Sequence, residues 1–312
     1  MVDLSVRCGG LTLANPVMPG SGTFNESMAR VIDIDRLGAL VTKTITPEPR
    51  HGNPQPRVAE VTGAMLCSIG IPSKGPDHYL AEILPLYAGS RAPLIASISA
   101  STAGRFAALA SRLTVAGVSA IEANISCPNL EEDGRAFAMV ARDTENVVAR
   151  IRAATSLPVW AKLTPNVGDI TEIARAAEAA GADALVVANA LLGMAIDVQT
   201  FRPKLGNVMG GVTGPAVKPV ILRMVYQCAR AVKVPIVGCG GIANVEDAVE
   251  YMLAGATAVQ VGTASFVQPT AMIDIIDALP AFLQRNGLTR VADLTGAVRV
   301  SEAVDPLWQM AG

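Results

Sequence analysis

The chain has 312 residues, of which 51% are hydrophobic and 17% charged, and its formal net charge is −2 at pH 7. This near-neutral balance, without a cluster of lysine and arginine, gives no electrostatic reason to expect nucleic acid or an anionic membrane surface as a partner. The five cysteines form no C-x-x-C pair, and only two histidines are present. These counts argue against a disulfide framework, an iron–sulfur cluster and a metal site in this chain.

The mean hydropathy of +0.40 raises the question of a membrane span. Gly, Pro or polar residues interrupt every apolar run before it reaches the roughly 18 residues that a spanning helix needs. The N-terminal stretch MVDLSVRCGG lacks the charged-then-apolar pattern of a signal peptide. We therefore expect a cytoplasmic protein.

Short apolar runs alternate with helix-like stretches along most of the chain. LSVRCGGLTL, residues 4–13, is predicted to form a β-hairpin that turns at Cys8-Gly9-Gly10 and caps the bottom of the fold. Runs too short for helices predict eight strands, buried on both faces as in parallel sheets. These strands are expected at 16–22, 39–46, 93–99, 120–127, 158–165, 184–190, 235–241 and 258–264. Helices are expected at 102–116, 143–155, 169–181 and 244–255.

A repeated phrase supports this alternation. AGVSAIEA (116–123), AGADALVV (180–187) and AGATAVQV (254–261) each predict a helix that ends at Ala-Gly, a short turn and a buried strand. Eight parallel strands separated by helices predict an α/β fold, a (β/α)8 TIM barrel formed by residues 1–312 as a single domain. A doubly wound sheet is the alternative, which the strand count disfavours. The long connections 47–92 and 191–219 are expected to build a site over the C-terminal face of the barrel.

The residues at the C-terminal ends of the predicted strands form a polar ring with two lysines. It contains no carboxylate pair for glycosidase chemistry and no Ser/His/Asp set, so hydrolysis is disfavoured. The ring consists of Ser21, Gly22, Lys43, Thr44, Ser97, Asn124, Cys127, Lys162, Asn189, Gly240, Gly241, Gly262 and Thr263.

Glycine-rich segments follow the last two strands. GCGGI (238–242) and VGTA (261–264) each precede a helix, and bare backbone N–H groups at such positions favour phosphate. GGVTG (210–214) offers further backbone donors. The alternative is that these glycines only make tight turns, but two such loops on adjacent strands favour a phosphate site.

Lys43 and Lys162 lie inside apolar strands, where an unpaired ammonium is costly. An anionic ligand or the electron-rich edge of a flavin explains them better than a surface role. Cys8, Cys228 and Cys239 are expected to be small buried side chains. Cys127, in EANISCPN, follows a strand with no histidine placed to assist it, so it is predicted to act in proton transfer or as a nucleophile.

The motifs TKTIT, EANISCPN, AKLTPN, GGVTGPAVKP, GCGGI and VGTA occur in this order over almost the whole chain, which therefore resembles the dihydroorotate dehydrogenases. Gly134-Arg135-Ala136-Phe137 and LLGMAID (191–197) are most similar to the catalytic subunit of the NAD-linked type, class 1B. The resemblance implies oxidation of dihydroorotate to orotate in pyrimidine biosynthesis, with FMN as cofactor. It also implies a homodimer joined by a separate subunit that carries FAD and a [2Fe–2S] cluster and passes electrons to NAD.

The resemblance also assigns roles to residues. Cys127 would be the general base at C5, and Lys43 would anchor the substrate. The residues implied for FMN are Ser21, Lys43, Thr44, Ser97, Asn124, Lys162, Ala188, Gly214, Gly240, Gly241, Gly262 and Thr263. Those implied for the substrate are Lys43, Cys67, Ser68, Ile69, Gly70, Ile71, Asn124, Asn129, Asn189 and Ala190.

Three positions depart from the family pattern. Cys67 stands where the family has Asn in an N-x-x-G loop, Ser97 where the third strand ends in Ala-Asn, and Ala190 where the sixth ends in Asn-Thr or Asn-Ser. Each change removes a hydrogen-bonding group, at a cost of roughly 1–3 kcal/mol for a buried ligand atom. Alternatives are therefore a related flavin oxidoreductase acting on another dihydropyrimidine or cyclic amide, a non-catalytic flavin- or phosphate-binding subunit, and an aldolase using Lys43 or Lys162.

Overall fold

The computed structural model describes residues 2–126 and 136–301. Its centre is a sheet of eight parallel strands in the order β3-β16-β15-β10-β9-β8-β7-β4. β3 lies against β4, and the Gly38 N–H donates to the Val17 carbonyl at 2.8 Å, which nearly closes the sheet. The predicted (β/α)8 barrel is therefore confirmed. The barrel strands are β3 (Val17–Pro19), β4 (Leu40–Val41), β7 (Leu94–Ile98), β8 (Ala120–Asn124), β9 (Val159–Lys162), β10 (Ala184–Val187), β15 (Ile236–Cys239) and β16 (Ala256–Val261).

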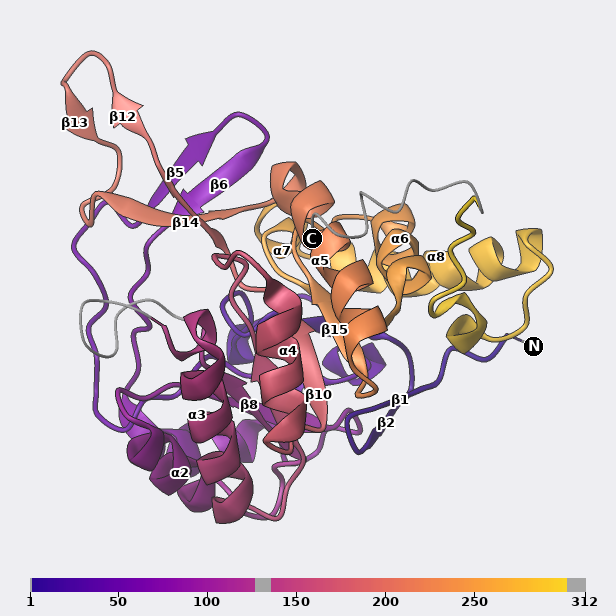
Figure 1. Cartoon of the computed structure of the whole chain (residues 1–312), viewed down its shortest axis with the longest axis horizontal. Helices are drawn as coiled ribbons and strands as arrows, with labels where there is room; N and C mark the ends of the chain where they lie inside the picture. The colour runs from indigo at the N-terminus through magenta and orange to yellow at the C-terminus, as the bar shows by residue number, and fades with distance from the viewer. Residues whose placement is uncertain (1, 127–135, 302–312) are drawn as a thin grey trace.

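Amphipathic helices surround the strands (Figure 1). Their apolar faces cover the barrel, and each of the four predicted stretches contains one helix. The helices are α2 (Ala103–Arg112), α3 (Ala141–Ala154), α4 (Ile170–Ala179), α5 (Lys218–Ala231), α6 (Val245–Ala254), α7 (Ala264–Val267) and α8 (Ala271–Arg285). Short helical segments are η1 (Glu26–Arg30), η2 (Ile34–Arg36), α1 (Gly75–His78), η3 (Tyr79–Ile83), η4 (Leu84–Tyr87), η5 (Phe137–Met139), η6 (Pro215–Val217) and η7 (Val291–Leu294).

The Ala-Gly repeats mark helix ends in two of the three places. α4 and α6 end directly before Ala180-Gly181 and at Ala254-Gly255. α2 ends earlier, at Arg112, so the prediction that it ends at Ala116-Gly117 is wrong. Just beyond this end, the Thr114 hydroxyl donates back to the Ala110 carbonyl at 2.8 Å.

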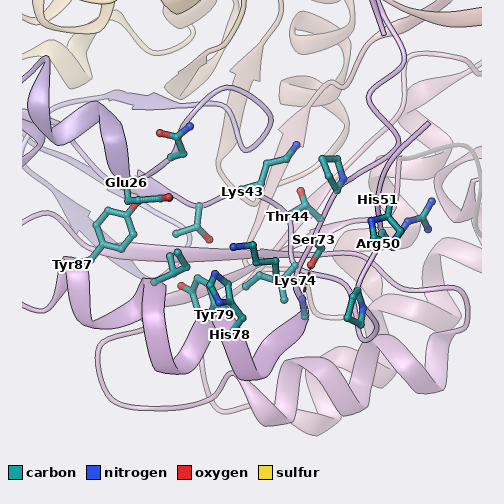
Figure 2. A pocket seen from close by; sticks show the side chains of 17 residues that line it. Glu26, Lys43, Thr44, Arg50, His51, Ser73, Lys74, His78, Tyr79 and Tyr87 are labelled. Atoms are coloured by element: carbon teal, nitrogen blue, oxygen red, sulfur yellow. Dashed lines mark hydrogen bonds between the residues drawn. The ribbon is translucent and has the colours of Figure 1, made fainter. Parts of the chain in front are cut away.

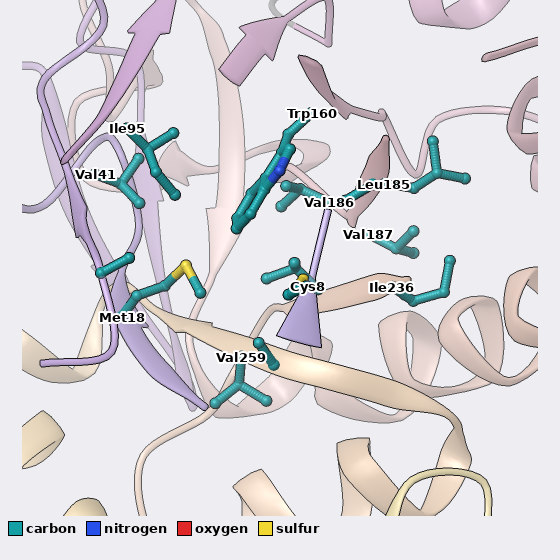
Figure 3. Packing of buried hydrophobic residues seen from close by; sticks show 14 of the residues in the cluster. Cys8, Met18, Val41, Ile95, Trp160, Leu185, Val186, Val187, Ile236 and Val259 are labelled. Carbon is teal, nitrogen blue, oxygen red and sulfur yellow. The ribbon is translucent and has the colours of Figure 1, made fainter. Parts of the chain in front are cut away.

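The N-terminal hairpin closes the barrel bottom as predicted. β1 (Val6–Cys8) pairs with β2 (Leu11–Leu13) around Gly9 and Gly10, which both have positive φ. Figure 3 shows Cys8 packed among core residues near Trp160. The Trp160 indole donates to the Gly9 carbonyl at 2.9 Å, and a Cβ at Gly9 would lie 2.3 Å from that indole nitrogen. Only glycine fits this contact.

The two long connections build an antiparallel sheet that was not predicted. β5 (Val58–Val61) and β6 (Ala64–Cys67) pair with β14 (Met209–Thr213) and β11 (Leu191–Met194) in the order β11-β14-β6-β5. The register places Gly211 opposite Cys67. A further hairpin, β12 (Ile196–Asp197) with β13 (Arg202–Pro203), projects from this sheet (Figure 1). Within the described residues, no helix is long and apolar enough to cross a membrane.

Candidate functional site

Five polar side chains meet at the C-terminal ends of four barrel strands, and we call them the amide network. The Thr44 and Ser97 hydroxyls lie 3.0 Å apart. The Ser126 hydroxyl donates to Asn124 Oδ1 at 2.8 Å, and Asn189 Nδ2 donates to the Ser126 hydroxyl at 2.9 Å. Weaker contacts at 3.5 Å join Asn124 to Thr44 and to Asn189. Parallel strands thus bring distant polar residues together, and four of these five were predicted; Ser126 was not.

The buried lysine Lys162 ends β9 and has a partner that the sequence analysis did not identify. Its ammonium donates to Gln260 Oε1 at 2.9 Å, and Gln260 Nε2 donates to Glu122 Oε2 at 2.6 Å. Glu122 and Gln260 are 0% exposed and Lys162 is 5% exposed. Lys162 therefore has protein partners beside any ligand, because the Gln260 amide joins its ammonium to the Glu122 carboxyl group. Glutamate inside AIEA and glutamine inside AVQV, both otherwise apolar strands, were the signals that the sequence offered.

Burial alone would lower the pKa of Lys162, but Cys239 and Glu122 outweigh it and hold the pKa above its ordinary value. Burial raises the pKa of the Cys239 thiol, and the nearby Lys162 ammonium opposes this shift. Cys239 thus lies beside a cation, whereas Cys8 and Cys228 are buried side chains, as predicted.

Glycines at the ends of β14, β15 and β16 form a second group, which we call the glycine loops: Gly214, Gly240, Gly241 and Gly262. The first three have positive φ. A Cβ at Gly241 would lie 2.8 Å from the Gly214 carbonyl oxygen, and one at Gly240 would lie 2.9 Å from Ile221 Cγ1. A side chain would therefore crowd the loop at Gly240 and Gly241, and glycine-rich segments of this kind at strand ends suit a phosphate.

An ion pair between α5 and α6 lies next to the glycine loops. Lys218 Nζ lies 2.6 Å from Asp247 Oδ1 and 3.0 Å from Glu250 Oε2. Asp247 also accepts from the Ala243 and Asn244 N–H groups and completes a capping box with Asn244 at the start of α6. The hydrogen bond to Asp247 raises the pKa of Lys218. Together these contacts fix the segment that follows Gly241.

The predicted substrate loop, 67–71, follows β6 and is held by Asn53. Asn53 Nδ2 donates to the Ser68 hydroxyl at 2.7 Å, and the Asn53 N–H donates to the Ile69 carbonyl at 3.1 Å. Gly70 has positive φ, and a Cβ there would lie 2.4 Å from Asn53 Oδ1. Burial raises the pKa of the Cys67 thiol and Lys43 opposes this shift. Lys43 therefore acts electrostatically on the first residue of the loop.

The remaining predicted residues lie at the barrel mouth with two exceptions. The Gly20 N–H donates to the Val261 carbonyl at 2.8 Å. This hydrogen bond places Ser21, the next residue, close to Gly262 and Thr263. Ala188 donates to the Cys239 carbonyl at 3.0 Å, and Ala190 donates to Asn189 Oδ1 at 2.8 Å. Cys127 and Asn129 lie outside the described residues.

A cavity of about 590 Å³ opens beside Lys43 (Figure 2). It shares Lys43 and Thr44 with the predicted site. The rest of its lining was not predicted and includes Glu26, Arg50, Tyr79 and other side chains from η1, 49–51 and 72–87. It therefore extends the mouth between the segment that follows β3 and the long 47–92 connection.

Comparisons with known proteins agree on one family. The family model described as dihydroorotate dehydrogenase matches residues 3–283. The chain is 48% identical to the dihydroorotate dehydrogenase B (NAD(+)) catalytic subunit of Trichlorobacter lovleyi, over 95% of this chain and 98% of that protein. It is 47% identical to the protein of the same name from Desulforamulus reducens, over 96% and 99%.

Among solved structures, the crystal structure of the Eimeria tenella dihydroorotate dehydrogenase in complex with ferulenol matches with a TM-score of 0.78. The match covers 95% of this chain and 88% of that one, at 22% sequence identity. This likeness supports the barrel fold alone.

Proposed function

The chain belongs to the dihydroorotate dehydrogenase family, and we propose on that premise that it oxidises dihydroorotate to orotate in de novo pyrimidine biosynthesis, as a single barrel domain with FMN as cofactor. One observation carries this proposal: the amide network, Lys162 and the glycine loops meet at one edge of the barrel. A polar mouth with buried cations suits a small anionic substrate and a phosphorylated cofactor.

The residues present fit FMN. The glycine loops, with Thr263, offer backbone donors for its phosphate, and Lys162 offers a buried cation to the pyrimidine edge of its ring. Ser21, Thr44, Ser97, Asn124 and Ala188 lie on the intervening strand ends and are proposed to line the ring. The chemistry that FMN supplies when bound is acceptance of the hydride from substrate C6 at N5.

The chain's own residues bind the substrate and move one proton. Lys43, Asn124, Asn129, Asn189, Ala190 and the 67–71 loop are proposed to hold dihydroorotate, with Lys43 at its carboxylate. Cys127 is proposed to remove the C5 proton. Ser126, immediately before it, is 2% exposed and bonded to both Asn124 and Asn189. The chain directly before Cys127 is thus anchored at the barrel mouth, which supports this assignment.

The first experiment is the visible spectrum of the purified protein, followed by dihydroorotate added without oxygen. Flavin absorbance that dihydroorotate bleaches in the wild type but not in Cys127→Ala is the expected result. A colourless protein that cannot be reconstituted with FMN would exclude the assignment.

A second candidate, a related dihydropyrimidine or cyclic amide as substrate, is favoured by Cys67 and Ala190, which lack the amide and hydroxyl groups of the family pattern. In the same experiment, bleaching by dihydrouracil but not by dihydroorotate would support this candidate.

The proposal includes protein partners. The relatives quoted are named catalytic subunits, and we propose a homodimer joined by a separate subunit that carries FAD and a [2Fe–2S] cluster and reduces NAD. The projecting β12–β13 hairpin supports an assembly, because Ile196, Val198 and Phe201 are 53%, 71% and 87% exposed there. Light scattering of the purified chain tests the homodimer. A cytoplasmic location stays a prediction of the sequence.

A further inference from the structure

A row of three buried polar side chains crosses the inside of the barrel just below its mouth. Lys162 lies on β9, Gln260 on β16 and Glu122 on β8, and β16 is three strands away from β9 in the sheet. The two hydrogen bonds of 2.9 and 2.6 Å join them into one chain from ammonium to carboxylate. Barrel interiors are ordinarily filled by apolar layers, so this row is unusual for its position.

Stability alone does not explain Glu122. Its Oε2 accepts from Gln260, but its Oε1 has no hydrogen-bond partner among the described residues. Apolar residues of similar size are often as stabilising as a buried ion pair, and a half-satisfied carboxylate is worse. A reason connected with Lys162 is therefore needed.

The direction of the hydrogen bonds supplies that reason. Glu122 accepts from the amide nitrogen of Gln260, and this leaves the amide oxygen facing the ammonium of Lys162. A reversed amide would present its N–H donors to the ammonium and its oxygen to the carboxylate, and both contacts would be repulsive. Glu122 thus fixes the amide, and the amide fixes the ammonium.

Lys162 is also at the right level to act on a ligand. It pairs with Asn124 in the register of β8 and β9, and Asn124 belongs to the amide network at the mouth. Glu122 lies two residues earlier on β8, on the same face of the strand and one step deeper in the barrel. Glu122 therefore lies deeper in the barrel than Lys162, and Lys162 is nearer to the mouth.

We propose that Glu122 is a positioning residue: through Gln260 it holds the Lys162 ammonium charged and in place, and thereby sets the electron affinity of the bound flavin. The proposal rests on the FMN site of the proposed function. A held cation at the pyrimidine edge of the ring favours the electron-rich reduced form. Without the carboxylate, burial favours a neutral or displaced lysine.

The test is the midpoint potential of bound FMN, measured on the FMN-loaded protein by anaerobic reductive titration against a reference dye. Glu122→Gln keeps the shape of the side chain and removes its charge. We expect it to disfavour the reduced flavin by about tenfold, which lowers the two-electron potential by about 30 mV. Gln260→Met breaks the bridge but leaves both charged residues in place, and it should shift the potential in the same direction.

Two comparisons separate positioning from other roles. Glu178→Gln is the matched control, because Glu178 accepts from the Lys233 and Val234 N–H groups at the far end of the barrel strands; it should leave the potential unchanged. In a Lys162→Met background, Glu122→Gln should add no further shift, since Glu122 acts only through the lysine.

An unchanged or raised potential in Glu122→Gln would overturn the proposal, as would an equal shift in the Lys162→Met background. If Glu122→Gln does not fold, Gln260→Met decides by the same criteria. Wild-type protein that takes up no FMN would overturn the proposed function as well. That outcome differs from bound FMN whose midpoint potential is the same in the wild type and in Glu122→Gln.

Discussion

The glycine loops and the amide network lie at the same edge of the barrel but are built from different parts of the chain. The glycine loops present backbone, packed so closely that a Cβ at Gly241 would lie 2.8 Å from another carbonyl oxygen. The amide network and the 67–71 loop present side chains, joined by hydrogen bonds such as Asn189 to Ser126 and Asn53 to Ser68. A backbone site tolerates almost no substitution, whereas a side-chain site changes its chemistry with one residue.

The difference explains where this chain departs from the family pattern. Cys67, Ser97 and Ala190 all lie on the side-chain half of the mouth. Ser97 keeps a role there, since its hydroxyl meets Thr44 at 3.0 Å. The glycine loops show no such departure. Substrate preference is therefore expected to vary in the side-chain half, while binding of the FMN phosphate stays with the backbone half.

The largest effect is expected at Cys127. Cys127→Ala should slow reduction of the flavin by dihydroorotate by about 10²- to 10⁴-fold, the usual contribution of a general base. Stopped-flow absorbance without oxygen measures this rate. The FMN content should stay at the wild-type level, because the glycine loops are unaltered. An unchanged rate would remove Cys127 from the mechanism.

The next effect is expected at the glycine loops. Gly241→Val adds a side chain at a positive φ and within 3 Å of both the Gly214 carbonyl oxygen and Lys218. Crowding of about 1–3 kcal/mol should weaken FMN binding by about 5- to 150-fold, measured by fluorescence titration of the cofactor-free protein. Gly89→Ala is the control, because nothing lies within 4 Å of a Cβ there. Equal FMN affinity in both variants would contradict a backbone cradle.

A higher affinity for dihydroorotate is expected from a substitution in the side-chain half of the mouth. Cys67→Asn restores the amide of the family pattern and should tighten dihydroorotate binding by about tenfold, the value of one hydrogen bond to a buried ligand atom. The affinity follows from the dihydroorotate concentration that half-saturates the rate of flavin bleaching. Cys228→Ser, far from the mouth, controls for loss of a thiol. No gain would favour another substrate or compensation by Ser68.

The smallest effect concerns the ion pair next to the glycine loops. The pKa of Lys218 is raised above its ordinary value, so its contribution to stability is complete below about pH 10 and is lost as the pH rises through the folded-state pKa. Lys218→Met should therefore lower the Tm at pH 8 by a few degrees, for a loss of about 1 kcal/mol. As the pH rises through this raised pKa the two proteins should converge; a constant difference would mean lost packing instead.

Local signals in the sequence determined much of this protein. Short apolar runs and Ala-Gly repeats predicted the eight strands and four helices, because burial on both faces and helix C-caps leave marks within a few residues. Polar residues at the ends of those runs then predicted Thr44, Ser97, Asn124, Lys162 and Asn189 at one mouth, since parallel strands end together.

Only the tertiary structure decided the rest. The sheet that joins Cys67 to Gly211 and the chain from Lys162 through Gln260 to Glu122 both depend on residues far apart in sequence. Neither can be recognised from the pattern of one segment, because each needs partners from different segments of the chain. Periodicity identifies which residues are buried, but the closure of the barrel decides which buried residues meet.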